Sequence, residues 1–85
     1  MAERIILGVQ ITNRVKDVPV VQSLLTEYGC NIKTRLGLHE VGPSHCSTTG
    51  LLILEMFGAE SDILAFEEKL KKITGVVVKK MAFEE

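Results

Sequence analysis

The sequence predicts one small α+β domain in which an antiparallel sheet packs against two helices. Three observations support this class. The chain has 85 residues, which suits one domain at the small end of those that fold alone. Four segments carry the alternating or continuous apolar residues that are typical of strands. Two further segments, one in each half of the chain, carry apolar residues at helical spacing instead.

The first half of the chain predicts a strand followed by a helix. Ile5–Thr12 is rich in β-branched residues, and its alternate side chains would share one face. The helix is expected at Val18–Tyr28, where apolar residues recur every three or four positions. Asp17 is its predicted N-cap, and Gly29 would take the left-handed conformation that ends it.

Two strands joined by a hairpin are expected next. Ile32–His39 is the second predicted strand, and the segment Gly42–Ser44 with its central proline breaks it. Gly50–Phe57 is the third. It is apolar on both faces until Glu55, a pattern that is typical of a strand covered on both sides.

A second helix and a fourth strand close the chain. Ser61 is the predicted cap of this helix, and Gly75 ends it before the strand Val76–Phe83. Glu67 and Lys71 are four residues apart and would pair on the exposed side. The residues expected to face the core are Ile63, Phe66, Leu70 and Ile73.

Strand, helix, strand, strand, helix, strand is the ferredoxin-like arrangement, with both helices on one face of a four-stranded sheet. The other face would then expose Ile6 and one of two apolar sets, either Leu51 with Ile53 or Leu52 with Leu54. Monomers rarely leave such a patch in water. We therefore expect the chain to associate with itself as a homodimer or homotetramer.

Charge and cysteine content exclude several classes of protein. Ten basic and eleven acidic residues argue against direct nucleic-acid binding, which needs a basic face. No signal-peptide pattern or membrane-length apolar run appears. Two cysteines are too few for a disulfide framework. These features predict a cytoplasmic protein with free thiols, and Cys30 is expected to be buried and structural.

The metal-ligating residue types gather between the second and third strands. His39, His45 and Cys46 all fall in the segment 38–47, which we expect to be a loop. Imidazole and thiolate ligands suit nickel, zinc or iron. A site needs about four ligands, so Glu40 or a residue of another copy would have to complete it. The alternative is a solvated loop without a metal.

Cys46 could instead act as a nucleophile, with His39 or His45 as its base. Adjacent residues of an extended chain point apart, so His45 would reach Cys46 only if the loop folds back. No signal for an oxyanion hole accompanies these residues. We therefore expect no catalytic activity.

The second strand offers a candidate ligand site. Arg35 and Gly37 would share its outer face with Lys33 and His39, where an interface between copies could hold an anion. An ion pair between Arg35 and Glu55 of another copy is the simpler alternative. Gly37 would allow a ligand or another backbone to approach closely, or would mark a bulge.

Three segments carry a resemblance to a known family: Thr34–Val41 (TRLGLHEV), Thr49–Glu55 and Ile73–Lys79. Over almost the whole of residues 1–85, the chain resembles the iron-only hydrogenase system regulators. That family is similar in fold to ACT domains and to the C-terminal domain of the nickel-responsive repressor NikR. The resemblance implies a single ACT-like domain with a regulatory role, which senses a small molecule between paired subunits.

The turn before the first helix is a second candidate ligand site. In ACT-like pairs this turn often lines the ligand, and here it carries Asn13 and Arg14. Free amides at a helix N-terminus favour an anion. Simple capping of the helix by Asp17 is the alternative interpretation.

The nickel repressor implies only part of a metal site in this chain. It holds its metal with a His-x-His on the second strand, a cysteine near the third strand and a histidine of a neighbouring subunit. His39 matches the second histidine, but Gly37 stands at the first and Cys46 lies in a longer loop. The repressor's DNA-binding arm has no counterpart here, so regulation would act through an unidentified protein partner.

Together these features predict a non-catalytic, ligand-sensing homo-oligomer whose effector is a small molecule or a metal ion. The resemblance adds a link to iron-only hydrogenase regulation. The alternative is a transition-metal-binding protein that uses His39, His45 and Cys46 to hold nickel, zinc or iron.

Overall fold

The computed structural model describes residues 3–12, 18–41 and 46–84, with the backbone alone at residues 3, 18, 38–41 and 46–49. The order of elements is the predicted one. The elements are β1 (Glu3–Ile11), α1 (Val18–Glu27), the short 3-10 helix η1 (Gly29–Asn31), β2 (Ile32–Val41), β3 (Cys46–Met56), α2 (Glu60–Lys71) and β4 (Val76–Glu84).

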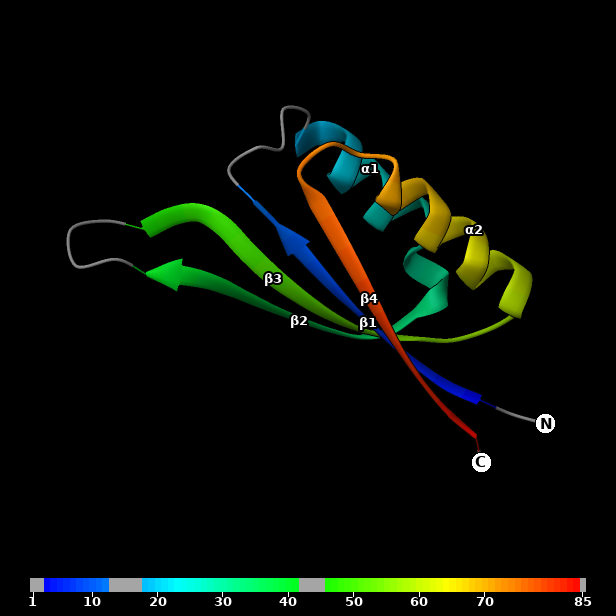
Figure 1. Ribbon diagram of the computed structural model, residues 1–85. Coiled ribbons are helices and arrows are strands. Elements are labelled where there is room, and N and C mark those ends of the chain that lie inside the picture. Colours follow the sequence, from blue (N-terminus) through cyan, green and yellow to red (C-terminus); the bar gives the residue numbers. More distant parts are fainter. Residues whose placement is uncertain (1–2, 13–17, 42–45, 85) are drawn as a thin grey trace.

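The four strands form one antiparallel sheet in the order β2-β3-β1-β4. Both helices lie on the same face of this sheet, and no described segment covers the other face (Figure 1). The strands β2 and β3 run past the helices as a two-stranded arm (Figure 1). In β1 the pairing with β4 is continuous from Glu3, opposite Glu84, to Ile11, opposite Val76.

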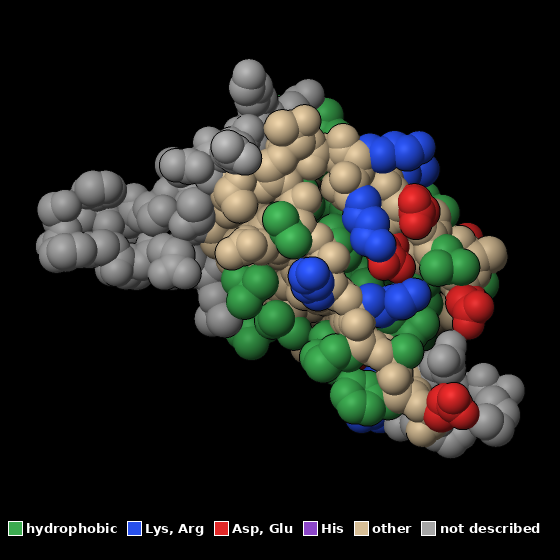
Figure 2. Space-filling view, in the orientation of Figure 1, with side chains coloured by type: hydrophobic (Ala, Val, Ile, Leu, Met, Phe, Trp, Pro, Cys, Tyr) green, Lys and Arg blue, Asp and Glu red, His purple; other side chains and the backbone are tan. Residues whose placement is uncertain are grey.

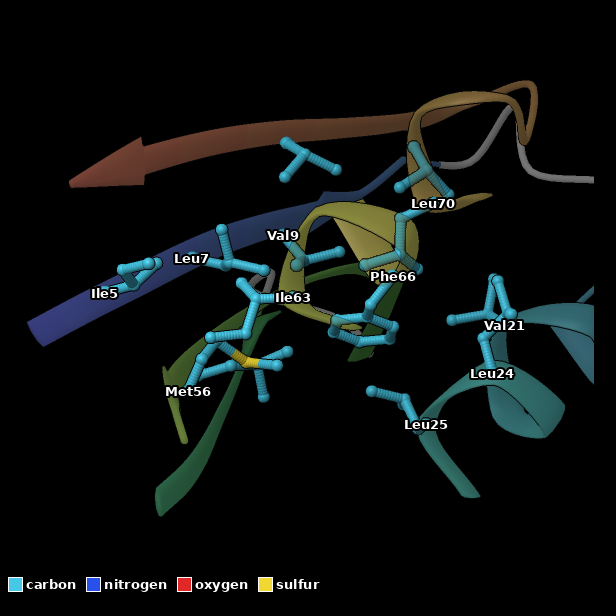
Figure 3. Packing of buried hydrophobic residues seen from close by; sticks show 13 residues of the cluster. Ile5, Leu7, Val9, Val21, Leu24, Leu25, Met56, Ile63, Phe66 and Leu70 are labelled. Carbon is cyan, nitrogen blue, oxygen red and sulfur yellow. The ribbon is translucent and has the colours of Figure 1, made fainter. Parts of the chain in front are cut away.

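The core lies between the sheet and the helices. Alternate residues of β1 point inward, so Leu7 and Val9 are fully buried. Phe66 of α2 is also fully buried, and its ring lies between the sheet residues and the α1 side chains (Figure 3). It meets the ring of Tyr28 with centroids 5.0 Å apart. This contact joins α2 to the end of α1 and completes the apolar layer.

Two helix ends differ from the predictions. Ala59, not Ser61, is the N-cap of α2, and it offers no side-chain hydrogen bond. The amide of Asp62 instead donates to the carbonyl of Ala59 at 3.0 Å. Gly29 does not take a left-handed conformation, because the chain continues directly into η1. Gly75 has a left-handed φ of 89°, in the turn between the end of α2 at Lys71 and the start of β4 at Val76.

A buried carboxylate ties α2 to β4. Glu67 is 4% exposed, and its carboxylate lies 3.0 Å from Nζ of Lys71 and 3.5 Å from Nζ of Lys80. Burial raises the pKa of this carboxyl, but the hydrogen bond with Lys71 and the charges of Lys80 and Lys71 outweigh it. The pKa therefore lies below its ordinary value of 4.5.

The predicted pair between Glu67 and Lys71 is confirmed, but its expected place on the solvent side of α2 is wrong. The sequence of the helix alone could not show that Lys80 of a distant strand compensates the buried charge.

Candidate functional site

The most extended candidate site is the sheet face that the helices leave uncovered, which we call the open face. Leu7, Val9 and Leu54 point into the core, so their strand neighbours point the other way. The described residues of the open face are Arg4, Ile6, Gly8, Gln10, Thr34, Leu36, Leu51, Ile53, Glu55, Val77, Lys79, Met81 and Phe83.

Apolar side chains dominate the open face and come from all four strands. Leu36 is 53% exposed and Met81 is 54% exposed, while Leu51, Val77 and Phe83 are exposed as well. Hydrophobic side chains gather along β4 on the side away from the helices, whereas charged side chains mix between β4 and α2 (Figure 2). The predicted apolar patch is therefore present, and it is built from Ile6 with the set Leu51 and Ile53.

The contribution of β4 to this patch was missed at the level of sequence. Val77, Met81 and Phe83 all fall on alternate positions of one strand, which is the signal that could have revealed it.

One acidic residue of the open face has its partners on the two flanking strands. Glu55 of β3 accepts a hydrogen bond from Oγ1 of Thr34 on β2 at 3.0 Å. Its other carboxylate oxygen lies 3.6 Å from Nε of Arg4 on β1. These contacts satisfy the charge of Glu55 within the chain.

Arg35 and Gly37 do not lie on the open face, so the expectation that Arg35 could meet Glu55 there is wrong. Arg35 pairs with the buried Leu54, and Gly37 pairs with Leu52. Residues directly opposite each other point to the same face, which is here the helix side. The register shifts between Ile32 and Thr34, and such a bulge reverses the alternation that the sequence suggests. Ligand binding by Arg35 and Gly37 stays a prediction.

The predicted metal segment is only partly a loop. His39 lies opposite Gly50, and pairing continues past one register shift until Val41 lies opposite Cys46. Both predicted ligands His39 and Cys46 therefore belong to strands, on the arm formed by β2 and β3. Their side chains and the whole of His45 lie outside the described residues.

Within the part of the chain whose side chains are described, no three His, Cys, Asp or Glu residues are grouped to hold a metal ion. This observation does not bear on His39, His45 and Cys46, and binding of nickel, zinc or iron by them stays a prediction.

Of the other residues singled out in the sequence, the structure describes only some. Asn13, Arg14 and the predicted cap Asp17 lie outside the described residues. Cys30 is a free thiol, as predicted, but it is exposed and not buried, because η1 lies at the surface.

Neither α1 nor α2, the two α-helices in the described ranges, is long and apolar enough to cross a membrane.

Comparison with solved structures relates this fold to known proteins. The chain is similar to the uncharacterized protein TM1266 from Thermotoga maritima, with 25% identity and a TM-score of 0.78 over 98% of this chain and 100% of that chain. It is also similar to CPII from Thiomonas intermedia K12, a nitrogen regulatory PII-like protein bound to ADP, AMP and bicarbonate. That match has 13% identity and a TM-score of 0.56, over 99% of this chain and 96% of that chain.

A formyltetrahydrofolate deformylase from Pseudomonas putida KT2440 also contains a similar unit. Its identity is 16% and its TM-score is 0.51, over 92% of this chain but 28% of that chain. No protein-family model and no curated protein matches the chain. The strand order, the two helices on one face and these structural likenesses together show that the chain has a ferredoxin-like α+β fold.

Proposed function

We propose that this chain is a non-catalytic regulatory module that senses a small ligand while associated with copies of itself. The observation that carries the proposal is the apolar open face, because self-association supplies a cover for it. The structural likeness to a PII-like regulatory protein bound to ADP, AMP and bicarbonate supports the sensing role.

The ligand class that this likeness favours is a nucleotide or a small anion. A ligand can change the assembly only if it binds one assembly state more tightly than another. An unidentified protein partner would then read the assembly state. The resemblance to iron-only hydrogenase system regulators supports the further proposal that this partner belongs to a hydrogenase system.

Several charged side chains among the described residues have a partner within the chain. Glu67 pairs with two lysines, Glu55 is held by Thr34 and Arg4, and Lys69 pairs with Glu27 at 3.3 Å. Pairs of this kind neutralise charge within the fold. The candidate nucleophile Cys46 and its candidate bases His39 and His45 lie outside the described side chains, so the absence of catalysis stays part of the proposal.

A thermal-shift screen tests the proposal directly. The tag-free protein is heated with adenine nucleotides, bicarbonate, amino acids and divalent metals, one at a time. A ligand that binds only the folded state raises the melting temperature, and the rise grows with its concentration above Kd. Stabilisation by one class, together with a ligand-dependent change in mass in solution, is the expected result. A melting temperature that none of these classes changes would reject the sensing role.

The second candidate function is binding of a transition metal by the arm. The observation that favours it is the register of β2 and β3. Val41 lies opposite Cys46, and His39 comes two positions before Val41 on β2. A histidine and a cysteine therefore lie near the same end of these two neighbouring strands. Its test is given in the Discussion.

A further inference from the structure

We propose that the free edge of β2 binds an extended segment of a partner protein as an added strand, and that acidic and apolar residues alternate in this segment. The inference rests on the proposed function and deepens it, because it gives the chemistry of the protein segment that would read the module. The sheet order places β2 at one border, with β3 on one side and no described strand on the other (Figure 1).

The middle of β2 is uncovered on both faces as well as at its edge. The residues from Lys33 to Gly37 are all exposed, although Leu36 points to the open face and Arg35 to the helix side. The helices therefore do not cover this part of the strand. A strand that lacks a neighbour presents a row of unpaired backbone amides and carbonyls, which is a template for another extended chain.

The pairing of β2 with β3 leaves a regular edge that is long enough to hold a strand. From Thr34 to His39 the register is unbroken. An extended chain of this length spans roughly 20 Å, which is about the length of an ordinary strand. Bulges protect many edge strands from further pairing, but the register shifts of β2 lie at the two ends of this stretch and not within it.

An added strand would also support the arm. The pairing of β3 with β1 ends at Gly50, opposite Ile11, whereas its pairing with β2 continues to Cys46, opposite Val41. In the described residues, the sheet therefore narrows to two strands beyond Gly50. A two-stranded ribbon is only marginally stable in water, and a third strand strengthens it. A strand along the edge of β2 would pair with both the wide and the narrow part of the sheet.

The side chains of β2 specify what the added strand should carry. Between residues 32 and 39 the strand has two basic residues, Lys33 and Arg35, and no acidic residue. Neither forms an ion pair with another described residue. Opposite charges that face each other across paired strands attract, so the added strand should place an acidic residue beside Arg35. Leu36 points to the other face and is 53% exposed, which favours an apolar neighbour there.

A second copy of the chain does not offer this complement at its own sheet edges. Its β2 would bring the same two basic residues, and its β4 carries Lys79 and Lys80 in the middle, with Glu84 only at the end. Like charges that face each other across paired strands destabilise the pairing. Basic residues on an edge also keep copies apart. An edge with that role alone binds no acidic strand, so experiment separates the two explanations.

Peptide binding to the full chain tests the inference. The probe is a fluorescent synthetic peptide of roughly eight residues, with glutamate and valine in alternation, which is long enough for an ordinary strand. Its counterpart has lysine in place of glutamate. We expect the chain to bind the acidic peptide, as measured by fluorescence anisotropy, and Arg35→Glu to weaken this binding at least about fivefold. The matched control Lys79→Glu reverses one exposed charge on the opposite edge strand and should leave the affinity nearly unchanged.

Amide hydrogen exchange locates the bound peptide. Backbone amides of β2 that point away from β3 should exchange more slowly when the acidic peptide is present, because they then donate to its carbonyls. The amides of β4 should exchange at the same rate with and without the peptide.

Failure of the acidic peptide to bind at protein concentrations on the order of hundreds of micromolar overturns the inference. Equal binding of the lysine peptide, or equal effects of Arg35→Glu and Lys79→Glu, overturns it as well. So does protection of the β2 edge by a second copy before any peptide is added. If Arg35→Glu fails to fold, as judged by circular dichroism, Lys33→Glu replaces it, since that side chain is also exposed. The ligand screen fails or succeeds separately, because it uses small molecules and metals and measures melting temperatures.

Discussion

Lys80 on the outermost strand β4 lies 3.5 Å from the buried carboxylate of Glu67 on α2. This contact joins two elements that are separated by a turn in the sequence and lie at one border of the core. Lys71, one turn further along α2, holds the same carboxylate from the other side at 3.0 Å.

Replacing Glu67 by glutamine should reduce the free energy of unfolding at neutral pH by about 1–2 kcal/mol, because both lysines lose a charged partner but remain partly solvated. The folded pKa of Glu67 lies below 4.5. The ionised carboxylate therefore stabilises the fold fully above the ordinary pKa of 4.5, and this stabilisation is lost as the pH falls through the lower folded pKa. Urea unfolding at several pH values measures this, with the exposed Glu68→Gln as control. A deficit that stays constant into the acid range would contradict the assignment.

The turn between β3 and α2 should not tolerate a side chain at Gly58. This residue has φ 101°, and a Cβ atom would lie 2.9 Å from Nδ2 of Asn31. That amide donates to the carbonyl of Phe57 at 3.0 Å, and the amide of Phe57 donates to the carbonyl of Asn31 at 2.7 Å. We expect Gly58→Ala to cost about 1–3 kcal/mol in thermal or urea unfolding. Gly29→Ala is the control, and equal losses for the two variants would disprove this account of the turn.

The ring of Phe66 should dominate the packing of α2 on the sheet. It is fully buried and contacts Tyr28, which follows α1. Phe66→Leu keeps part of this volume and should unfold at a lower urea concentration than the unchanged chain. Phe66→Ala should reduce the free energy of unfolding by about 3–5 kcal/mol. Leu64→Ala on the same helix, where the side chain is 42% exposed, should change the urea midpoint little. A Phe66→Ala protein as stable as the Leu64→Ala protein would be incompatible with this core.

Metal binding by the arm can be tested without a histidine tag. The purified chain is reconstituted with nickel, zinc or iron, dialysed and submitted to elemental analysis. If the prediction holds, His39→Ala and Cys46→Ala lose the bound metal, because each removes a ligand of a small set. Cys30→Ser retains it, since Cys30 lies in η1, away from the arm. Less than about a tenth of an equivalent in the unchanged chain would reject the site.

The order of elements and most of the core could be predicted because they depend on local periodicity. Leu7, Val9, Phe66 and Leu70 are all buried at positions where alternation or helical spacing places them. The assignment of Arg35 to a face failed because it depends on a bulge in the pairing of β2 with β3. Pairing between strands is a tertiary property, and a single extra residue reverses every side chain that follows.

The burial of Glu67 and the exposure of Cys30 were missed for the same reason. Residue type predicts an exposed glutamate and a buried cysteine. The partner that compensates Glu67 lies on another element, and the surface position of η1 follows from how the chain leaves α1. Neither can be inferred from the neighbouring residues alone.

Glu55 also favours one register of β3 against its neighbouring strands during folding. Its neighbours Leu54 and Met56 are buried, and the opposite side of the strand carries further aliphatic residues, so apolar character alone distinguishes the two sides poorly. A slip by one residue would turn every side chain over and drive this acid under the helices without Thr34 or Arg4. A single carboxylate thus selects the correct alignment, because the wrong one would bury an uncompensated charge.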